Sequence, residues 1–266
     1  MPFYHSDGLK YYRFPSFEAH GVIHAALARQ GGSSPSPWAS LNLGGTVGDD
    51  STRVFENRQR AFAALQLRFD SQFDVWQVHS DQVVVADGPR TPSQEIQQAD
   101  AILTDRPGVT LFMRFADCVP VYLYDPRKRV VGLAHAGWMG TIKRTAGNAV
   151  RTMVEAFGSQ PEEIITGIGP SIAAHHYPVG AEVAAQVRAA FGEHAESLLI
   201  PVEADQPAPG VKFDLWEANR LILRQEGVQQ VELCSLCTAC HTSDWYSHRA
   251  ENGRTGRFGA LIALPE

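Results

Sequence analysis

The chain has 266 residues, of which 44% are hydrophobic and 20% charged, and its formal net charge is −6 at pH 7. This composition is typical of a globular protein with a sizeable core, and the negative charge argues against nucleic-acid or anionic-membrane partners. No apolar run reaches the ~18 residues that a membrane span needs, and the first residues lack a secretory signal pattern. We therefore expect a cytoplasmic protein whose four cysteines are thiols or metal ligands.

Strand-like and helix-like segments alternate along the chain, which predicts an α/β fold with a mixed sheet. Apolar and β-branched runs predict strands at residues 21–28, 74–86, 108–115, 119–125, 130–136, 163–169 and 259–264. Helical spacing of apolar residues predicts helices at residues 51–67, 141–157, 181–191 and 214–227. Asp214 and Glu217 form a capping-box pattern at the start of the last helix. We expect residues 201–210 to be a surface loop and residues 1–266 to form a single domain.

Three residues that bind soft metals lie at or near the ends of separate predicted strands. They are His79, Cys118 and His135. Two imidazoles and one thiolate suit zinc, and three protein ligands leave a fourth position for water or substrate, as in catalytic zinc sites. Their spacing matches no compact motif, so the spacing alone does not show that the three side chains meet.

The same residues are compatible with two other functions. In a metal-free cysteine hydrolase, Cys118 would be the nucleophile, His135 the base and His79 the group that orients it. In a binding protein with a structural zinc, His175 or His176 would supply a fourth ligand. Elemental analysis and alkylation of the cysteine separate the hydrolase from a zinc enzyme. Four protein ligands around the metal, with no room for water, would indicate the structural zinc.

Several motifs along the chain resemble those of one enzyme family. They are QVHSDQV, ADAILTD, RFADCVPVYLYDP, HAGWMGT, GIGPSI and CTACHTSDWYSHRAENGRTGRFGALI. They resemble the purine nucleoside phosphorylase family, formerly described as multicopper polyphenol oxidases or laccase-domain proteins. The resemblance implies a four-layer α/β/β/α sandwich and a zinc ion held by His79, Cys118 and His135. It also implies phosphorolysis of adenosine, inosine, guanosine and methylthioadenosine, with purine nucleoside and inorganic phosphate as partners and adenosine deamination as a second activity.

The same resemblance marks residues that are expected to face the substrate. The stretch ARQGGSSPSPWASLNLGGTVGDD and the following ENR place Arg29, Asn42 and Arg58 in a family signature, and the SHR and TGR elements contain Arg249 and Arg257. Phosphorolysis requires inorganic phosphate to be bound beside the nucleoside. Arginine is suited to this role because it binds phosphate through paired N–H donors. The glycine-rich LGGTVG lacks the lysine of a P-loop and is expected to form a wall of the pocket.

The chain departs from the family pattern at two turns. Met139 stands where HAGWRG has an arginine, and His175 and His176 stand where IGPCCYEVG has two cysteines. We expect the two histidines to be a polar loop pair rather than ligands. The spacing of Cys234, Cys237, Cys240 and His241 resembles zinc and iron–sulfur ligand sets but lacks the rest of either motif, so a metal there is not expected.

The histidine pattern bears on copper chemistry. A multicopper oxidase needs close-set His-x-His pairs and a cysteine next to histidine, and neither pattern occurs around Cys118. Copper is therefore expected only as a secondary ion, with polyphenol oxidation as an alternative activity. The sequence carries no sign of oligomerisation, and we expect a monomer.

Overall fold

The computed structural model describes residues 3–202 and 210–265, so most of the predicted 201–210 loop lies outside the described residues. The strands are β1 Phe3–Ser6, β2 Leu9–Tyr12, β3 Ile23–Leu27, β4 Gln72–Phe73, β5 Val83–Val85, β6 Ala101–Thr104, β7 Thr110–Phe115, β8 Val119–Asp125, β9 Val130–Ala136, β10 Ile165–Ile168, β11 Pro178–Val179, β12 Leu199–Pro201, β13 Val211–Phe213, β14 Gln230–Leu233 and β15 Phe258–Ala263. The helices are α1 Pro15–Glu18, α2 Ser51–Ala64, α3 Trp138–Ile142, α4 Thr145–Phe157, α5 Ala181–Phe191, α6 Ala195–Leu198 and α7 Leu215–Gln225.

The described strands form three sheets. One six-stranded sheet has the order β1-β2-β3-β15-β7-β4, the other has β14-β10-β8-β9-β6-β5, and a small sheet has β11-β13-β12. Most neighbours are antiparallel, but β4 pairs with β7, β5 with β6, and β14 with β10 in parallel. Both large sheets are therefore mixed.

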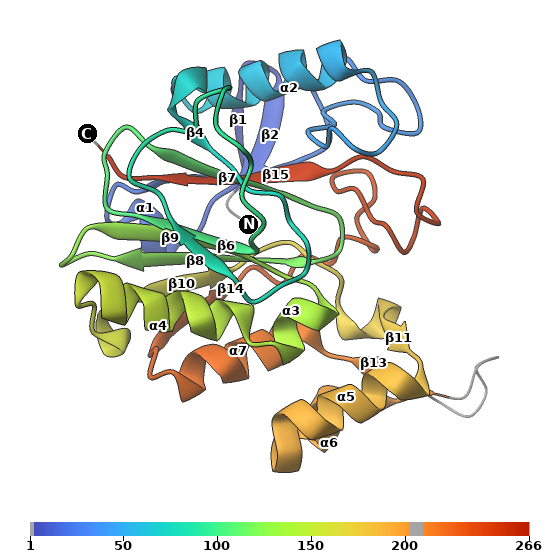
Figure 1. Ribbon diagram of the computed structural model, residues 1–266. Coiled ribbons are helices and arrows are strands. Elements are labelled where there is room, and N and C mark those ends of the chain that lie inside the picture. The colour runs from blue at the N-terminus through green and yellow to red at the C-terminus, as the bar shows by residue number, and fades with distance from the viewer. Residues whose placement is uncertain (1–2, 203–209, 266) are drawn as a thin grey trace.

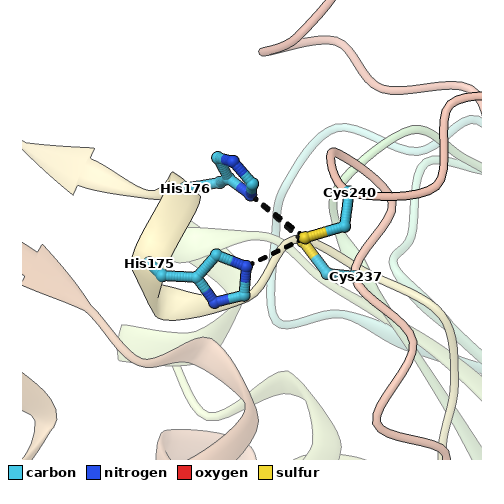
Figure 2. Close-up of side chains that lie close together, drawn as sticks. All are labelled: His175, His176, Cys237 and Cys240. Carbon is cyan, nitrogen blue, oxygen red and sulfur yellow. Dashed lines mark hydrogen bonds between the residues drawn. The ribbon is translucent and has the colours of Figure 1, made fainter.

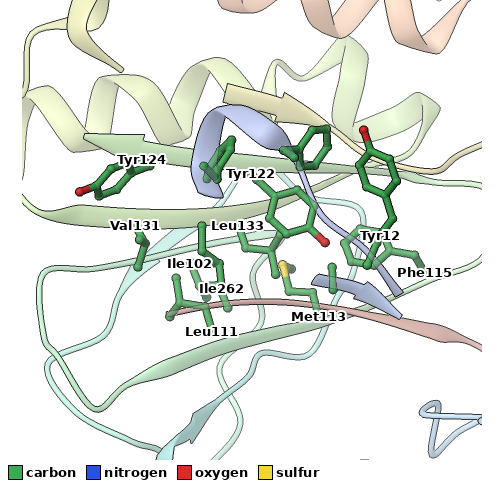
Figure 3. Close-up of a cluster of buried hydrophobic side chains, with 14 of the residues drawn as sticks. Tyr12, Ile102, Leu111, Met113, Phe115, Tyr122, Tyr124, Val131, Leu133 and Ile262 are labelled. Carbon is green, nitrogen blue, oxygen red and sulfur yellow. The ribbon is translucent and has the colours of Figure 1, made fainter. Parts of the chain in front are cut away.

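The two large sheets pack face to face and helices cover their outer faces (Figure 1). One core contains side chains from both sheets, among them Leu111 and Ile262 from the first and Tyr122 and Leu133 from the second (Figure 3). Alternate residues of the same strands face outward, where Phe112 packs with α2 and Leu123 packs with α4 and α7. The layers are α/β/β/α, which confirms the predicted fold class.

Strands with two buried faces match their prediction well. The predicted strands 119–125 and 130–136 coincide with β8 and β9, in which every residue is buried. The predicted strands 21–28, 108–115, 163–169 and 259–264 correspond to β3, β7, β10 and β15 within two residues at each end. Short or half-exposed strands, including β1, β2, β6 and β14, were not predicted because they carry little periodic signal.

Two predicted elements are wrong in the same way, because the backbone turns inside them. Residues 74–86 are not one strand: His79 has a φ of 57° and only Val83–Val85 pairs as β5. Residues 141–157 form two helices, α3 and α4, separated at Arg144, whose φ is 63°. The first change of direction is at His79 itself, and the second is next to the loop that carries it, since the Thr145 hydroxyl donates to the Ser80 carbonyl.

The helix ends follow local hydrogen-bonding rules. The Asp50 side chain accepts hydrogen bonds from the first N–H groups of α2, and Asp214 accepts from the Glu217 N–H at the start of α7. The capping box at α7 is half formed, since the Glu217 carboxylate pairs with Arg220. Gly158 ends α4 in the left-handed conformation. Across residues 3–202 and 210–265, no helix has both the length and the apolar character needed to cross a membrane.

Candidate metal centre and cavity

The structure brings His79, Cys118 and His135 together. One ligand atom from each lies within 4.8 Å of the other two, and the Cys118 sulfur is 3.9 Å from His79 Nε2. His79 lies on the loop before β5, Cys118 immediately precedes β8, and His135 is the penultimate residue of β9. Among the residues that the structure describes, this group contains three ligands, which leaves a coordination position free.

Asp100 fixes the orientation of His135. Its Oδ1 lies 2.9 Å from His135 Nδ1, and the His135 backbone N–H also donates to the Asp100 carbonyl at 2.7 Å. With Nδ1 directed at the carboxylate, Nε2 is the ring nitrogen available to a metal. Sequence reasoning missed Asp100, although the ADAILTD motif contains it.

The same carboxylate shapes the loop that carries His79. Asp100 Oδ2 accepts hydrogen bonds from the backbone N–H groups of Val78 and Ser80 and from the Ser80 hydroxyl. These bonds replace a strand ladder on both sides of His79, which explains why residues 74–86 do not form a single strand. One buried carboxylate therefore positions two of the three candidate ligands.

Gly137 allows the three ligands to approach one another. A Cβ atom at this position would lie 2.7 Å from the Cys118 sulfur and 3.2 Å from His79 Cδ2. A side chain there would displace a ligand, so the HAGW turn requires glycine for space. The chain changes direction directly after His135, since α3 begins at Trp138 with Gly137 as its N-cap.

The electrostatics of the site favour a thiolate and an imidazolium in the metal-free protein. Burial alone would raise the pKa of Cys118, but the neighbouring His135 and His79 lower it to about 6. Burial alone would lower the pKa of His135, but Cys118 and Asp100 raise it to about 9. A thiolate at neutral pH is the form that binds zinc or acts as a nucleophile.

The ligands open on a cavity of about 760 Å³. Its charged lining consists of five arginines and two aspartates: Arg58, Arg90, Arg114, Arg249, Arg257, Asp74 and Asp117. This local excess of positive charge contrasts with the net charge of −6 of the whole chain. The cavity is suited to an anionic ligand.

Three of the five residues predicted to face the substrate line this cavity: Arg58, Arg249 and Arg257. Burial lowers the pKa of Arg58 to about 10 and also lowers that of Arg257, and both remain cationic at neutral pH. Within the described residues neither has a carboxylate in salt-bridge range. A run of glycines lies between them, since a Cβ on Gly44 would meet the Arg257 stem at 2.7 Å and one on Gly45 would lie 3.7 Å from the Arg58 guanidinium. The predicted glycine-rich wall is present.

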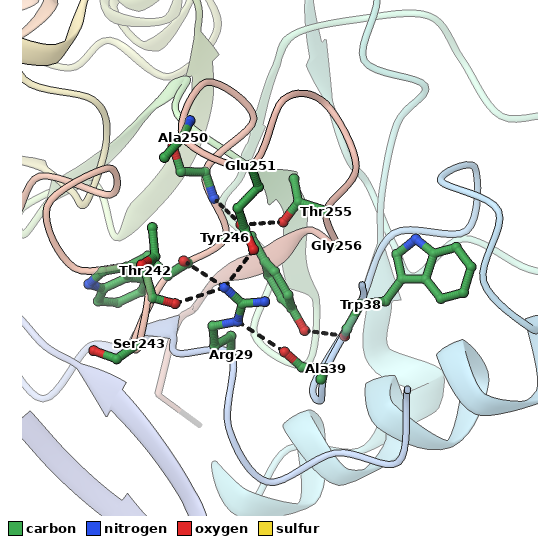
Figure 4. A network of polar contacts seen from close by, with 12 residues as sticks. Arg29, Trp38, Ala39, Thr242, Ser243, Tyr246, Ala250, Glu251, Thr255 and Gly256 are labelled. Atoms are coloured by element: carbon green, nitrogen blue, oxygen red, sulfur yellow. Dashed lines mark hydrogen bonds and ion pairs between the residues drawn. The ribbon is translucent and has the colours of Figure 1, made fainter. Parts of the chain in front are cut away.

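Arg29 is not among the residues that line the cavity. Its guanidinium donates to the carbonyls of Ala39 and Thr242, pairs with Glu251 at 3.0 Å and lies over the Tyr246 ring (Figure 4). These contacts join the chain before α2 to the C-terminal loops. The structure therefore places Arg29 in the support of the cavity rather than on its surface.

Asn42 is also absent from the lining, and it is fully buried. Its side-chain oxygen accepts from the backbone N–H groups of Gly44 and Arg257, and its amide donates to Asp49. Asn42 therefore holds the glycine run against Arg257. Like Arg29, Asn42 does not face the cavity itself and only positions residues that do.

Asp117 connects the Cys118 turn to the C-terminal loops. Its two carboxylate oxygens accept hydrogen bonds from the Thr238 hydroxyl and the Arg249 backbone N–H, each at 2.6 Å. Both carboxylate oxygens are engaged, so the contacts of Asp117 give it a positioning role.

Sequence reasoning also missed a second charged group at the cavity. Asp74 pairs with Arg90 at 2.8 Å and with Arg114 at 2.7 Å. Arg114 is the one charged residue in β7, where it follows the apolar run Leu111–Met113, and this was a usable signal. Trp76 and Trp138 line the cavity as well, whereas Phe115 is buried beside the His135 ring.

A second group of potential ligands lies outside the cavity. His175, His176, Cys237 and Cys240 have one ligand atom each within 4.8 Å of the others (Figure 2). The histidines therefore do not complete the first group, and a structural zinc closed by His175 or His176 beside Cys118 is wrong. His175 and His176 are exposed on a short turn, as expected for a polar loop pair, and Cys237 and Cys240 lie beside them.

Comparison with known proteins identifies the family. The model of the family described as multi-copper polyphenol oxidoreductase laccase matches residues 23–265. The chain belongs to this family. Purine nucleoside phosphorylase of Deinococcus radiodurans is 40% identical over 261 residues, covering 98% of this chain and 95% of that protein. Purine nucleoside phosphorylase YlmD of Bacillus subtilis is 36% identical, covering 92% and 89%. The crystal structure of YlmD from Geobacillus stearothermophilus has a TM-score of 0.89 and 33% identity over 100% of this chain and 99% of that one.

Membership in this laccase-domain family confirms the resemblance and supports an enzyme of the purine nucleoside phosphorylase type, because its relatives carry that name. The candidate ligands do not support the multicopper chemistry that the family description names. Neither ligand group among the described residues contains more than two histidines, which is too few for a multicopper cluster.

Proposed function

We propose that the protein is a zinc-dependent purine nucleoside phosphorylase. It would cleave the bond between the base and the sugar of adenosine, inosine, guanosine or methylthioadenosine and transfer the sugar to inorganic phosphate. The products are the free base and ribose 1-phosphate, or methylthioribose 1-phosphate from methylthioadenosine. The observation that carries the proposal is the convergence of His79, Cys118 and His135 on an arginine-rich cavity.

The donor set fits zinc rather than magnesium or calcium, which prefer oxygen ligands. Bound there, zinc would supply a Lewis acid that polarises an oxygen of the substrate or of phosphate. The protein's own contribution is to hold His135 through Asp100, to keep Cys118 as a thiolate and to leave space at Gly137.

Phosphate binding is assigned to Arg58 and Arg257 on either side of the glycine run. Both residues are half-buried, and their guanidinium groups donate to backbone carbonyls without a carboxylate in salt-bridge range among the described residues. A bound anion would balance their charge. Met139 is not among the lining residues, so phosphate binding is assigned to arginines that do line the cavity.

The purine is assigned to the aromatic part of the lining. Trp76 lines the cavity while its side chain is 48% exposed, an arrangement that suits stacking on a flat base. Tyr177 and Trp138 lie in the same lining. Adenosine deamination is proposed as a second activity, because a base held there would lie in the cavity onto which the metal ligands open.

One observation favours a second candidate, a metal-free cysteine hydrolase. Cys118, His135 and Asp100 form a nucleophile, a base and an orienting carboxylate, and the lowered pKa of Cys118 suits a nucleophile. In this version Asp100 takes the orienting role that the sequence suggested for His79. Activity that survives complete removal of metal would support the hydrolase over the zinc enzyme.

The decisive experiment incubates zinc-loaded protein with inosine, with and without inorganic phosphate, and separates the products by chromatography. Hypoxanthine and ribose 1-phosphate should form only with phosphate, and Cys118→Ala should abolish both. Cys234→Ala is the matched control, because Cys234 is a buried thiol outside both ligand groups. If the folded, zinc-loaded protein releases no base from inosine, nor from adenosine, guanosine or methylthioadenosine in parallel incubations, the proposal fails.

The predictions of a single domain over residues 1–266, a monomer and a cytoplasmic location stay predictions. Light scattering coupled to size-exclusion chromatography tests whether the protein is a monomer.

A further inference from the structure

We propose that His175, His176, Cys237 and Cys240 form a second metal site that binds one Zn²⁺ ion. The four ligand atoms come from two segments about sixty residues apart, yet all lie within 4.8 Å of one another. Figure 2 shows both imidazoles beside the cysteine side chains, with dashed contacts running from the rings to sulfur. Two thiolates and two imidazoles are a common ligand set of structural zinc sites.

The distances fit a single ion. The Cys240 sulfur lies 3.0 Å from His175 Nε2 and 3.5 Å from His176 Nδ1, and the Cys237 sulfur lies 3.7 Å from His176 Nδ1. Ligand atoms at usual Zn–S and Zn–N bond lengths around one tetrahedral centre are separated by about 3.5 Å for a sulfur–nitrogen pair. The group therefore needs only small side-chain movements to bind zinc.

The backbone holds both segments in position. Ser171 and Cys237 form an isolated parallel bridge, and the Thr238 N–H donates to the Ser171 carbonyl at 3.1 Å. The Ala173 N–H donates to the Cys237 sulfur at 3.4 Å, a contact that stabilises a thiolate ligand. His175 and His176 follow on a single 3-10 turn, Ala174–His176, so the site is organised before a metal arrives.

The site differs in type from the first group. Four protein ligands close the coordination shell, whereas His79, Cys118 and His135 leave a position open toward the cavity. Cys237 is buried, but the other three ligands are exposed, so an ion enters from solvent without passing through the cavity. The assigned role is therefore structural.

The second site would fasten two segments that contribute to the cavity wall. Tyr177, which lines the cavity, directly follows His176. Thr238 lies between the two cysteines in sequence, and its hydroxyl donates to Asp117, the neighbour of Cys118. A bound ion would limit the movement of both segments relative to the metal centre.

Metal content tests the proposal without reference to activity. The full-length protein, purified with reductant, loaded with zinc and desalted, should contain about two zinc ions per chain by mass spectrometry of the metal. Cys118→Ala and the double variant Cys237→Ser/Cys240→Ser should each retain about one ion, and the triple variant none. Cys234→Ala should retain both.

Cobalt identifies the ligands that bind the remaining ion. Co²⁺ added to the Cys118→Ala protein should give the visible bands of a tetrahedral centre and a thiolate charge-transfer band. His175→Ala/His176→Ala in the same background changes exposed side chains, so the fold is retained, and it should weaken cobalt binding at least tenfold.

Two results would overturn the proposal. One is a Cys118→Ala protein that is folded and binds neither zinc nor cobalt. The other is a wild-type mass showing a Cys237–Cys240 disulfide in protein that holds a single ion. Failure of the proposed function is distinguishable from failure of the second site. If only the proposed function fails, the Cys118→Ala protein still binds one ion.

Discussion

Replacing Asp100 by asparagine tests whether this carboxylate organises the metal centre. Asp100 accepts from His135 on one oxygen and from Val78 and Ser80 on the other. Asparagine has the same size but only one acceptor oxygen, and its NH₂ group donates. Whichever way the amide turns, it opposes either the His135 ring or the two backbone N–H groups beside His79.

The structure sets the expected magnitude. Loss of a carboxylate behind a ligating histidine typically weakens metal binding about 10- to 100-fold, or about 1.4 to 2.7 kcal/mol. Burial opposes ionisation of Asp100, yet the His135 and Ser80 contacts lower its pKa from 3.8 to about 2, which is worth about 2 kcal/mol of folding stability. Because the folded-state pKa is lowered, this stability is present above the unfolded pKa and is lost as the pH falls toward about 2.

Two measurements check this prediction. Zinc affinity comes from competition with a chelator, and the free energy of unfolding comes from urea titration of metal-free protein at neutral and acidic pH. Asp100→Asn should lose both zinc affinity and stability at neutral pH, and the stability difference should shrink under acidic conditions. Asp87→Asn, on an exposed turn, is the control. An Asp100→Asn protein with wild-type affinity and unfolding would refute the reasoning.

Three further substitutions or measurements address the same site. Gly137→Ala should reduce zinc content sharply because its Cβ would lie 2.7 Å from the Cys118 sulfur, whereas Gly88→Ala, which meets nothing within 4 Å, should not. Arg58→Ala should raise the KM for phosphate about 10- to 100-fold, because a charged hydrogen bond is lost, and should leave the KM for inosine nearly unchanged. Arg53→Ala, on the exposed face of α2, is the control. Equal effects of Arg58→Ala on both KM values would contradict the assignment. In metal-free protein, the rate of Cys118 alkylation, followed by mass spectrometry, should be nearly independent of pH well above the Cys118 pKa of about 6 and should fall below that pH. A rate profile with its midpoint near the usual pKa of a thiol would contradict the thiolate.

The sequence predicted the elements whose pattern is simple. The strands β8 and β9 are buried on both faces, and they appear as unbroken apolar runs with polar or turn residues at their ends. Residues 74–86 also contain several β-branched residues, but the Asp100 side chain binds the N–H groups of Val78 and Ser80. No local pattern shows a partner that is distant in sequence. The same limitation hid the break at Arg144.

The candidate site was predictable in its ligands and less so in their surroundings. The motifs indicated His79, Cys118 and His135, but only three-dimensional packing shows that they meet. Arg29 and Arg58 have the same chemistry in the sequence, yet one binds carbonyl oxygens in the support and the other lines the cavity. An arginine's partners are set by tertiary structure, so composition and motif position do not separate these two roles.

Backbone conformation at two residues of this site agrees with a role in positioning the ligands. His79 and Asp117 have φ values of 57° and 79°, and such left-handed conformations cost a non-glycine residue roughly 1–2 kcal/mol. Hydrogen bonds to other segments hold each of these conformations. Asp100 accepts from the N–H groups on both sides of His79, and Asp117 accepts from Thr238 and Arg249. A fold that only needed a stable turn could place glycine at either position. Retaining a metal-binding side chain at one, and the residue that anchors the Cys118 turn at the other, is expected where the geometry serves a bound ion.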